Sequence, residues 1–274
     1  MGLPHAETSG SVLAQELGTG VEMGTRELAA GASELGASAP EVASSGSFDA
    51  AGWTEARVAD GVVKPEMVAD RFRPLRDPAN LESYVRHLET RDTAFANELS
   101  RRVEQVRTAK GPVDLDAAMQ QIRKSTAGQL GESVAVDGFR PYFEGIEVQS
   151  RVELQSGTTI IDGRLLEARQ PVVLGRGLGV PEGGNLSIEV KTGRPQYLAR
   201  EIPHIADKQV QGHLQVGDQS LVVMSRDVYG VATERAARDA VGAAGSRIMA
   251  LLPEKATLDQ TLMRVIGERA GRLG

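Results

Sequence analysis

Two short segments of the 274-residue chain carry acidic and basic side chains of the kind that can bind a metal ion and a phosphate ester. Asp162 ends the segment 158–162, and Glu189 and Lys191 stand two residues apart in the segment 186–191. Residues two apart in a strand project from the same face, so Glu189 and Lys191 are expected to point together. If the strand that holds Asp162 pairs alongside, the two carboxylates meet.

Two converging carboxylates repel each other unless a cation lies between them, and such hard oxygen ligands suit Mg²⁺ or Mn²⁺. A bound divalent cation lowers the pKa of water and neutralises charge that builds on a phosphodiester. The Lys191 ammonium would then stabilise the attacking hydroxide or the pentacovalent phosphate. The alternative is a simple ion pair on an edge strand, because a Glu-x-Lys tripeptide often arises by chance and lysine is common at sheet edges.

Hydrophobic periodicity predicts the elements that hold these residues. Apolar positions three and four apart predict helices over 78–106, with Asp77 as a cap, and over about 115–134. A period of two then predicts strands over 146–154 and 158–162, joined by a Ser156-Gly157 turn, and a further strand over 186–191.

The remaining segments complete an α-β-β-β-α-β order between residues 115 and 225. They comprise a glycine- and proline-rich loop over 170–185, a helix from about His204 to Gln215, and an apolar strand over 221–224. Two helical segments split by Pro253 are expected to follow.

This order, with Asp162 and the Glu189-Val190-Lys191 tripeptide in place, resembles the restriction-endonuclease-like, or PD-(D/E)xK, phosphodiesterase superfamily. The resemblance covers residues 115–230. It implies an α/β fold with a restriction-endonuclease-like α-β-β-β-α-β core, preceded by a helical region and followed by C-terminal helices. By the same resemblance Asp162 and Glu189 are metal ligands for Mg²⁺ or Mn²⁺, and Lys191 is the catalytic lysine. Ile161 stands where the family motif has proline.

Two further residues match the superfamily pattern. Glu132, on the helix before the strands, resembles an additional acid that completes the metal site, although a solvated glutamate on a helix face is an equal alternative. Gln209 resembles a glutamine that orients the metal water or the scissile phosphate. Gln209 shares a helix face with His213 and Gln211 does not, which favours Gln209, but which of the two glutamines faces the site stays open.

The charge distribution limits how this chain would engage nucleic acid. The net charge is −6, of which residues 1–60 carry −7, so residues 61–274 sum to only +1. Binding therefore depends on a local cluster around the site. The basic residues in or beside the predicted strands and loop are Arg140, Arg151, Arg164, Arg169, Arg176, Lys191, Arg194, Arg200 and Lys208.

Composition excludes several other classes of site. The chain has no cysteine, which excludes disulfides, thiolate zinc sites and a cysteine nucleophile. No apolar run approaches the roughly 20 residues of a membrane-spanning helix, so no membrane partner is expected. The first residues show no pattern of a secretory signal peptide.

The layout has three parts: a flexible Gly/Ala/Ser-rich acidic leader over 1–60, a helical region over 61–114 and a nuclease-like domain over 115–274. It resembles that of bacterial polymorphic toxins. The resemblance implies an antibacterial, metal-dependent endonuclease effector, with DNA favoured over RNA, that a cognate immunity protein neutralises. Such a protein is cytoplasmic in its producer and is delivered to the target-cell cytoplasm by a non-classical, type VI-like route, with the N-terminal region contacting a secretion-apparatus or adaptor protein. The alternatives are a housekeeping restriction or repair nuclease and a catalytically inactive nuclease-fold interaction module.

Overall fold

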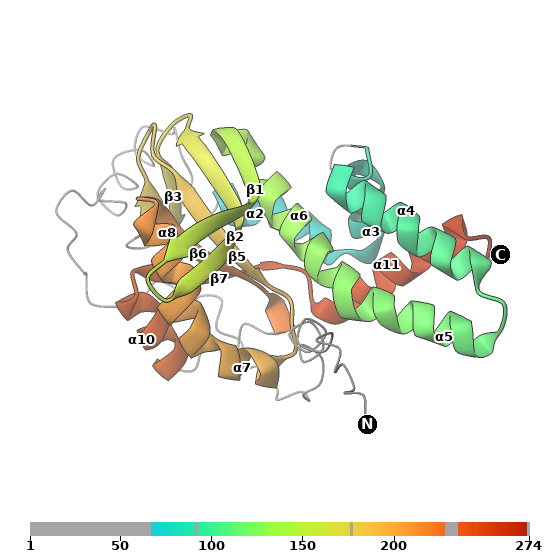
Figure 1. The fold of residues 1–274 in the computed structure, drawn as a ribbon. Helices are drawn as coiled ribbons and strands as arrows, with labels where there is room; N and C mark the ends of the chain where they lie inside the picture. The colour runs from blue at the N-terminus through green and yellow to red at the C-terminus, as the bar shows by residue number, and fades with distance from the viewer. Residues whose placement is uncertain (1–66, 91–92, 176–177, 228–234, 273–274) are drawn as a thin grey trace, which may run out of the picture.

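The computed structural model describes residues 67–90, 93–175, 178–227 and 235–272, and the predicted leader over 1–60 lies outside them. The described part is a mixed α/β structure built on a five-stranded sheet, as the α/β prediction requires (Figure 1). The strands of this sheet, in spatial order, are β1 (Phe143–Leu154), β2 (Gly157–Ala168), β5 (Leu186–Lys191), β6 (Gln219–Ser225) and β7 (Ser246–Leu252).

The sheet is antiparallel on one side and parallel on the other. β1, β2 and β5 pair antiparallel, whereas β5, β6 and β7 pair parallel. β5 is therefore the central strand. A separate two-stranded sheet consists of β3 (Val172–Gly175) and β4 (Leu178–Val180). These strands lie where the sequence predicts only a loop, because the apolar run of β3 finds an antiparallel partner in β4.

Helices cover both faces of the sheet. In β6, Leu221 and Val223 contribute to one hydrophobic cluster, and Val222 and Met224 contribute to another. The first cluster joins the sheet to α6 (Ala127–Phe139) and α11 (Lys255–Arg269). The second joins it to α7 (Pro195–His204), the π-helical segment η4 (Ile205–Val210) and α10 (Arg235–Ala243). Short α8 (Gln211–Gln215) continues η4.

The N-terminal helices pack on the same core as α6 and α11. α3 (Pro78–Leu88) and α4 (Thr93–Thr108) contribute fully buried leucines to the first cluster, and in Figure 1 they gather with α11 at one end of the molecule. Asp77 caps α3 as predicted, accepting hydrogen bonds from the backbone N–H groups of Ala79 at 2.8 Å and Asn80 at 3.1 Å. The other helical elements here are α2 (Met67–Phe72), η1 (Arg73–Arg76), α5 (Pro112–Gln121), η2 (Ile122–Thr126) and η3 (Arg140–Tyr142).

Two predictions about helices are wrong. The helix expected from about His204 begins at Pro195, because a proline at the first helical position suits the start of a helix. Pro203 lies inside α7, and the chain continues as a π-helix directly after it. The first of the two expected C-terminal helical segments is interrupted by β7, whose Met, Ala and Leu residues favour a helix locally but pair with β6.

No helix within the described ranges is long and apolar enough to span a bilayer.

Candidate functional site

The backbone pairing between β2 and β5 ends next to Asp162. The pairing of β2 with β5 runs from Leu165 opposite Leu186 to Gly163 opposite Ile188 and goes no further. Just beyond that point the Asp162 carboxylate accepts a hydrogen bond from the backbone N–H of Val190, through Oδ2 at 2.8 Å. The Asp162 side chain thus takes the place of the next backbone hydrogen bond between the strands. It links β2 to the part of β5 that carries Glu189 and Lys191.

Glu189 and Lys191 lie together on one face of β5. The Lys191 ammonium donates a hydrogen bond to Glu189 Oε1, and the Glu189 side chain is 1% exposed. Its other carboxylate oxygen, Oε2, is buried and has no hydrogen-bond partner among the described residues. Because β5 is the central strand, the edge-strand explanation for this ion pair does not apply.

Burial disfavours the charged forms of Asp162, Glu189 and Lys191. It raises the pKa of Glu189 to about 8, while the Lys191 ammonium opposes this shift and the Asp162 carboxylate adds to it. Burial also raises the pKa of Asp162, against the effects of Lys191 and of the Val190 N–H. Burial alone would lower the pKa of Lys191, but Glu189 and Asp162 outweigh it and raise that pKa. The site therefore concentrates two acids around one ammonium.

Glu132 reaches this site through a residue that sequence reasoning missed. Gln149 Nε2, on β1, donates to Glu132 Oε2 at 3.1 Å and approaches Asp162 Oδ1 at 3.5 Å. Glu132 is on α6, so the amide links a helix to the strand that carries Asp162. Across the described residues, no three His, Cys, Asp or Glu side chains form a group arranged to hold a metal ion.

Gln209 and Gln211 differ in burial. Gln209 lies in the π-helical segment η4, and its Oε1 is buried without a hydrogen-bond partner in the described part of the chain. Gln211 is exposed. This agrees with the choice of Gln209 as the inward-facing residue, and π-helical turns often occur at functional sites.

His213 is fully buried on the same helical layer. Its Nδ1 lies 2.6 Å from Ser220 Oγ, and its Nε2 is buried with no partner in the described ranges. Burial lowers the pKa of His213 to about 4. The imidazole is therefore neutral near pH 7 and adds no positive charge to the site.

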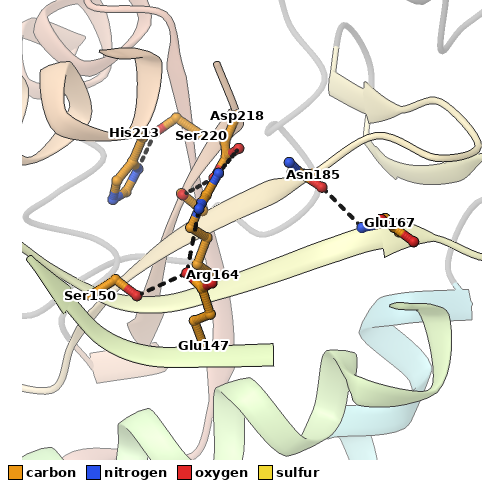
Figure 2. A network of polar contacts seen from close by, with 9 residues as sticks. Glu147, Ser150, Arg164, Glu167, Asn185, His213, Asp218 and Ser220 are labelled. Atoms are coloured by element: carbon orange, nitrogen blue, oxygen red, sulfur yellow. Dashed lines mark hydrogen bonds and ion pairs between the residues drawn. The ribbon is translucent and has the colours of Figure 1, made fainter. Parts of the chain in front are cut away.

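A polar network beside the site uses one of the predicted phosphate-binding arginines (Figure 2). Arg164 donates to both oxygens of the buried Asp218, at 2.6 and 3.2 Å, and Ser187 Oγ donates to the same carboxylate at 2.6 Å. Arg164 also contacts Glu147 at 3.4 Å. The Arg164 guanidinium is occupied by these contacts, which link β2 to Ser187 of β5 through Asp218, the residue directly before β6.

Three other residues of the predicted basic cluster are also paired with acids. Arg140 pairs with Asp137, Arg169 with Glu144 and Lys191 with Glu189. Arg176 lies outside the described residues. No ion pair is found in the described part for Arg151, Arg194, Arg200 and Lys208.

The only sequence feature that could have identified Gln149 is the position of the hairpin turn between β1 and β2. The hairpin turn is Gln155-Ser156, so Leu154 pairs with Gly157, and the same register sets Gln149 opposite Asp162. The predicted turn at Ser156-Gly157 is one residue too late and would have placed Arg151 opposite Asp162.

The chain matches no family model, no curated protein and no solved structure in the comparisons made with each of these collections.

Proposed function

We propose that the protein is a Mg²⁺- or Mn²⁺-dependent endonuclease of the PD-(D/E)xK type that hydrolyses phosphodiester bonds, with DNA favoured over RNA. The observation that carries this proposal is the meeting of Asp162, Glu189 and Lys191 where β2 and β5 separate. A hydrophobic core does not need such a group, because each buried charge opposes folding unless it is paired.

The donor set fits a hard divalent cation. Asp162 and Glu189 supply carboxylate oxygens, and Glu189 Oε2 is buried without a partner among the described residues. Burial raises the pKa of both carboxyls, and a cation held by Asp162 and Glu189 would favour their ionised forms. Such a cation, when bound, lowers the pKa of water and neutralises charge on the phosphodiester.

The remaining residues have roles that follow from their positions. Lys191 holds a compact ammonium beside Glu189, which suits contact with a phosphate oxygen as negative charge develops there. Gln209 has a buried acceptor, Oε1, which can orient a water molecule by accepting its hydrogen. Arg151, Arg194, Arg200 and Lys208 are the candidates for contacts with the nucleic-acid backbone.

The biological role that we attach to this activity is an antibacterial effector delivered to a competitor's cytoplasm and neutralised by a cognate immunity protein. The support is the three-part layout of the sequence. Growth arrest on cytoplasmic expression, relieved by co-expression of the neighbouring small gene, tests this role. A housekeeping restriction or repair nuclease would be tolerated by the cell that makes it.

The enzymatic proposal is tested with purified protein, plasmid DNA and a structured RNA, with Mg²⁺ or with EDTA. We expect cleavage only with the cation, and a loss of at least about 100-fold in Asp162→Asn and in Glu189→Gln. Both variants should stay folded, with a melting temperature close to that of the wild type, since Asn and Gln keep the size of the side chains that they replace and an oxygen that accepts hydrogen bonds. Normal cleavage by either variant would contradict the site. A folded protein that cuts neither substrate would favour the inactive interaction module.

The two glutamines of the η4–α8 segment provide a matched pair. Gln209→Ala should slow cleavage by roughly tenfold, the order expected for loss of one positioning contact, whereas Gln211→Ala should change it little. Cation binding, measured by calorimetry, should be the same in both variants. The reverse order of effects would show that the helix presents its other face to the substrate.

A further inference from the structure

The backbone is strained directly opposite Asp162. Gln149 has φ of 53°, a left-handed conformation that costs a non-glycine residue roughly 1–2 kcal/mol. The pairs on either side, Val148 with Gly163 and Ser150 with Ile161, keep the same register. The same hairpin has a second gap of this kind at Glu144 and Glu167, where Glu167 also has φ of 53°. The distortion at Gln149 keeps the register on both sides and is therefore not an inserted residue; unlike the one at Glu167, it lies beside a candidate site residue.

The strained residue changes the direction of the side chains around it. In a regular strand Glu147 and Ser150, three residues apart, would project from opposite faces. Here Ser150 Oγ donates to Glu147 Oε2 at 3.2 Å, and Figure 2 shows the two side chains meeting beside Arg164. The left-handed conformation of Gln149 explains why the Glu147 and Ser150 side chains lie on the same face of β1.

The amide of Gln149 lies between two acids. Nε2 carries two hydrogens, and its two recorded contacts are Glu132 Oε2 at 3.1 Å and Asp162 Oδ1 at 3.5 Å. The second distance is long for a hydrogen bond, so the contact is easily exchanged. Gln149 is also exposed to solvent, whereas Asp162 and Glu132 are half-buried. A neutral, solvent-accessible donor thus contacts two carboxylates on different elements.

We propose that Gln149 is a positioning residue that holds Glu132 and Asp162 toward one point in the cation-free protein and is displaced when a divalent cation binds there. This inference rests on the proposed function, because it assigns Gln149 a part in loading the same site. The amide partly offsets the repulsion between the carboxylates, and it is a weaker partner for them than Mg²⁺ or Mn²⁺. The side chain therefore maintains the site without competing strongly for it.

A charge series at this position tests the inference. Gln149→Glu adds a third carboxylate, and Gln149→Lys places a permanent ammonium between the two acids. We expect Mn²⁺ to bind Gln149→Glu at least about tenfold more tightly than the wild type, and Gln149→Lys at least about tenfold more weakly. The melting temperature in EDTA should follow the opposite order, with Gln149→Glu lowest. Binding is measured by calorimetry with Mn²⁺ alone, without nucleic acid.

Two controls separate this contact from general effects. Gln155→Glu and Gln155→Lys make the same charge changes in the exposed turn of the same hairpin and should shift neither quantity in this way. Gln149→Gly removes the amide and also relieves the left-handed strain. A melting temperature in EDTA that rises only in Gln149→Gly would identify Gln149 as a backbone feature and overturn the inference.

The outcomes distinguish the inference from the proposed function. If the wild type binds Mn²⁺ and cuts nucleic acid, but the affinity is the same in the Glu, Gln and Lys forms, the role of Gln149 is wrong and the nuclease proposal stands. If the wild type neither binds Mn²⁺ nor cuts, both fail. If the expected order of affinity appears without any cleavage, the inference stands and the enzyme proposal fails.

Discussion

Among single residues, Lys191 shows most directly how charge and size are combined in the site. Its ammonium is paired with Glu189, lies near Asp162, and is only 21% exposed. A guanidinium would keep the positive charge, but it is a larger, planar fork. Arginine could thus replace lysine in an ion pair with Glu189, but it could not replace lysine in a contact with a single phosphate oxygen.

We therefore predict that Lys191→Arg retains the fold and loses cleavage by about 100-fold, the usual cost of removing one donor to a developing oxyanion. The measurement is the turnover number with saturating Mg²⁺, together with the melting temperature. Lys191→Met serves as the reference for complete loss of charge. Wild-type turnover in the arginine variant would mean that Lys191 only balances the charge of Glu189.

His213 predicts a pH dependence of stability. Burial lowers its pKa to about 4 in the folded protein, while the unfolded chain binds this proton below about pH 6.5. The contribution of His213 to stability is therefore complete above pH 6.5 and is lost as the pH falls toward 4. The expected loss is about 2 kcal/mol by pH 5. Urea denaturation at several pH values measures it.

Two substitutions make the assignment to His213 specific. His213→Asn keeps a donor near Ser220 and removes the titration, so the free energy of unfolding should fall less steeply with acid. His204→Asn changes an exposed histidine at the end of α7 and should leave the wild-type slope intact. Equal slopes in the wild type and His213→Asn would contradict the prediction.

The resemblance to the PD-(D/E)xK superfamily nominates Asp162, Glu189, Lys191 and Gln209, and the structure brings the first three together. Strand periodicity explains why Glu189 and Lys191 share a face. The approach of Asp162 depends in addition on the antiparallel pairing of β2 with β5. Gln149 could not be nominated in the same way. Its place opposite Asp162 depends on the exact position of a two-residue turn, and an error of one residue changes the partner.

At the scale of elements, local preference and tertiary context disagree in two places. β7 is built from residues that favour helices, and only its pairing with β6 makes it a strand. The α7–η4–α8 unit contains Pro203, which predicts a helix boundary, yet the chain continues past it as a π-helix. The packing of η4 against β2 is a property of the folded structure, and the sequence alone does not show it.

The crossing of α6 over the end of β5 depends on a close approach at Gly131. A Cβ at Gly131 would lie 2.4 Å from Thr192 Cγ2 and 3.3 Å from Leu252 Cδ1. Thr192 directly follows Lys191 and is buried, so it cannot turn into solvent. The helix and the candidate site are therefore coupled through this contact.

We predict that Gly131→Ala destabilises the protein by about 1–2 kcal/mol, since overpacking outweighs the gain of about 1 kcal/mol in helix propensity. It should also slow cleavage by displacing Thr192 and Lys191. Gly128→Ala is the control on the same helix, because its Cβ would meet Thr192 Oγ1 only at 4.0 Å. That variant should be neutral or more stable.

Thr192→Ser removes the methyl group that the new Cβ would meet. A double-mutant cycle between Gly131→Ala and Thr192→Ser should therefore show a favourable coupling of about 1 kcal/mol. Simple additivity of the two changes would show that α6 shifts to avoid the clash.

At the scale of the whole molecule, the helical region and the sheet share one hydrophobic cluster. Phe72, Leu81 and Leu99 from the N-terminal helices are buried in it together with residues of α6 and α11. α11, the last helix of the chain, packs on α3 and α4 near the beginning of the described part. Ion pairs between α11 and the N-terminal helices, such as Arg86 with Glu268, lie at the rim of this contact.

This arrangement predicts where the chain can be shortened. A fragment of residues 67–274 retains every described element, and we expect it to unfold cooperatively and to cleave like the full chain.

A fragment of residues 112–274 keeps all candidate site residues but uncovers the faces of α6 and α11 that the first helices bury. On α11 alone, Leu258, Leu262, Val265 and Ile266 are each 0% exposed. α11 also packs on α6 and η2, which the fragment keeps. Each of these side chains that the cut uncovers costs roughly 1.5–3 kcal/mol, so a few of them amount to a large part of the stability of a domain. The shorter fragment should therefore aggregate or show no cooperative transition in urea. If it folds and cleaves, the catalytic region is independent of the helices that precede it.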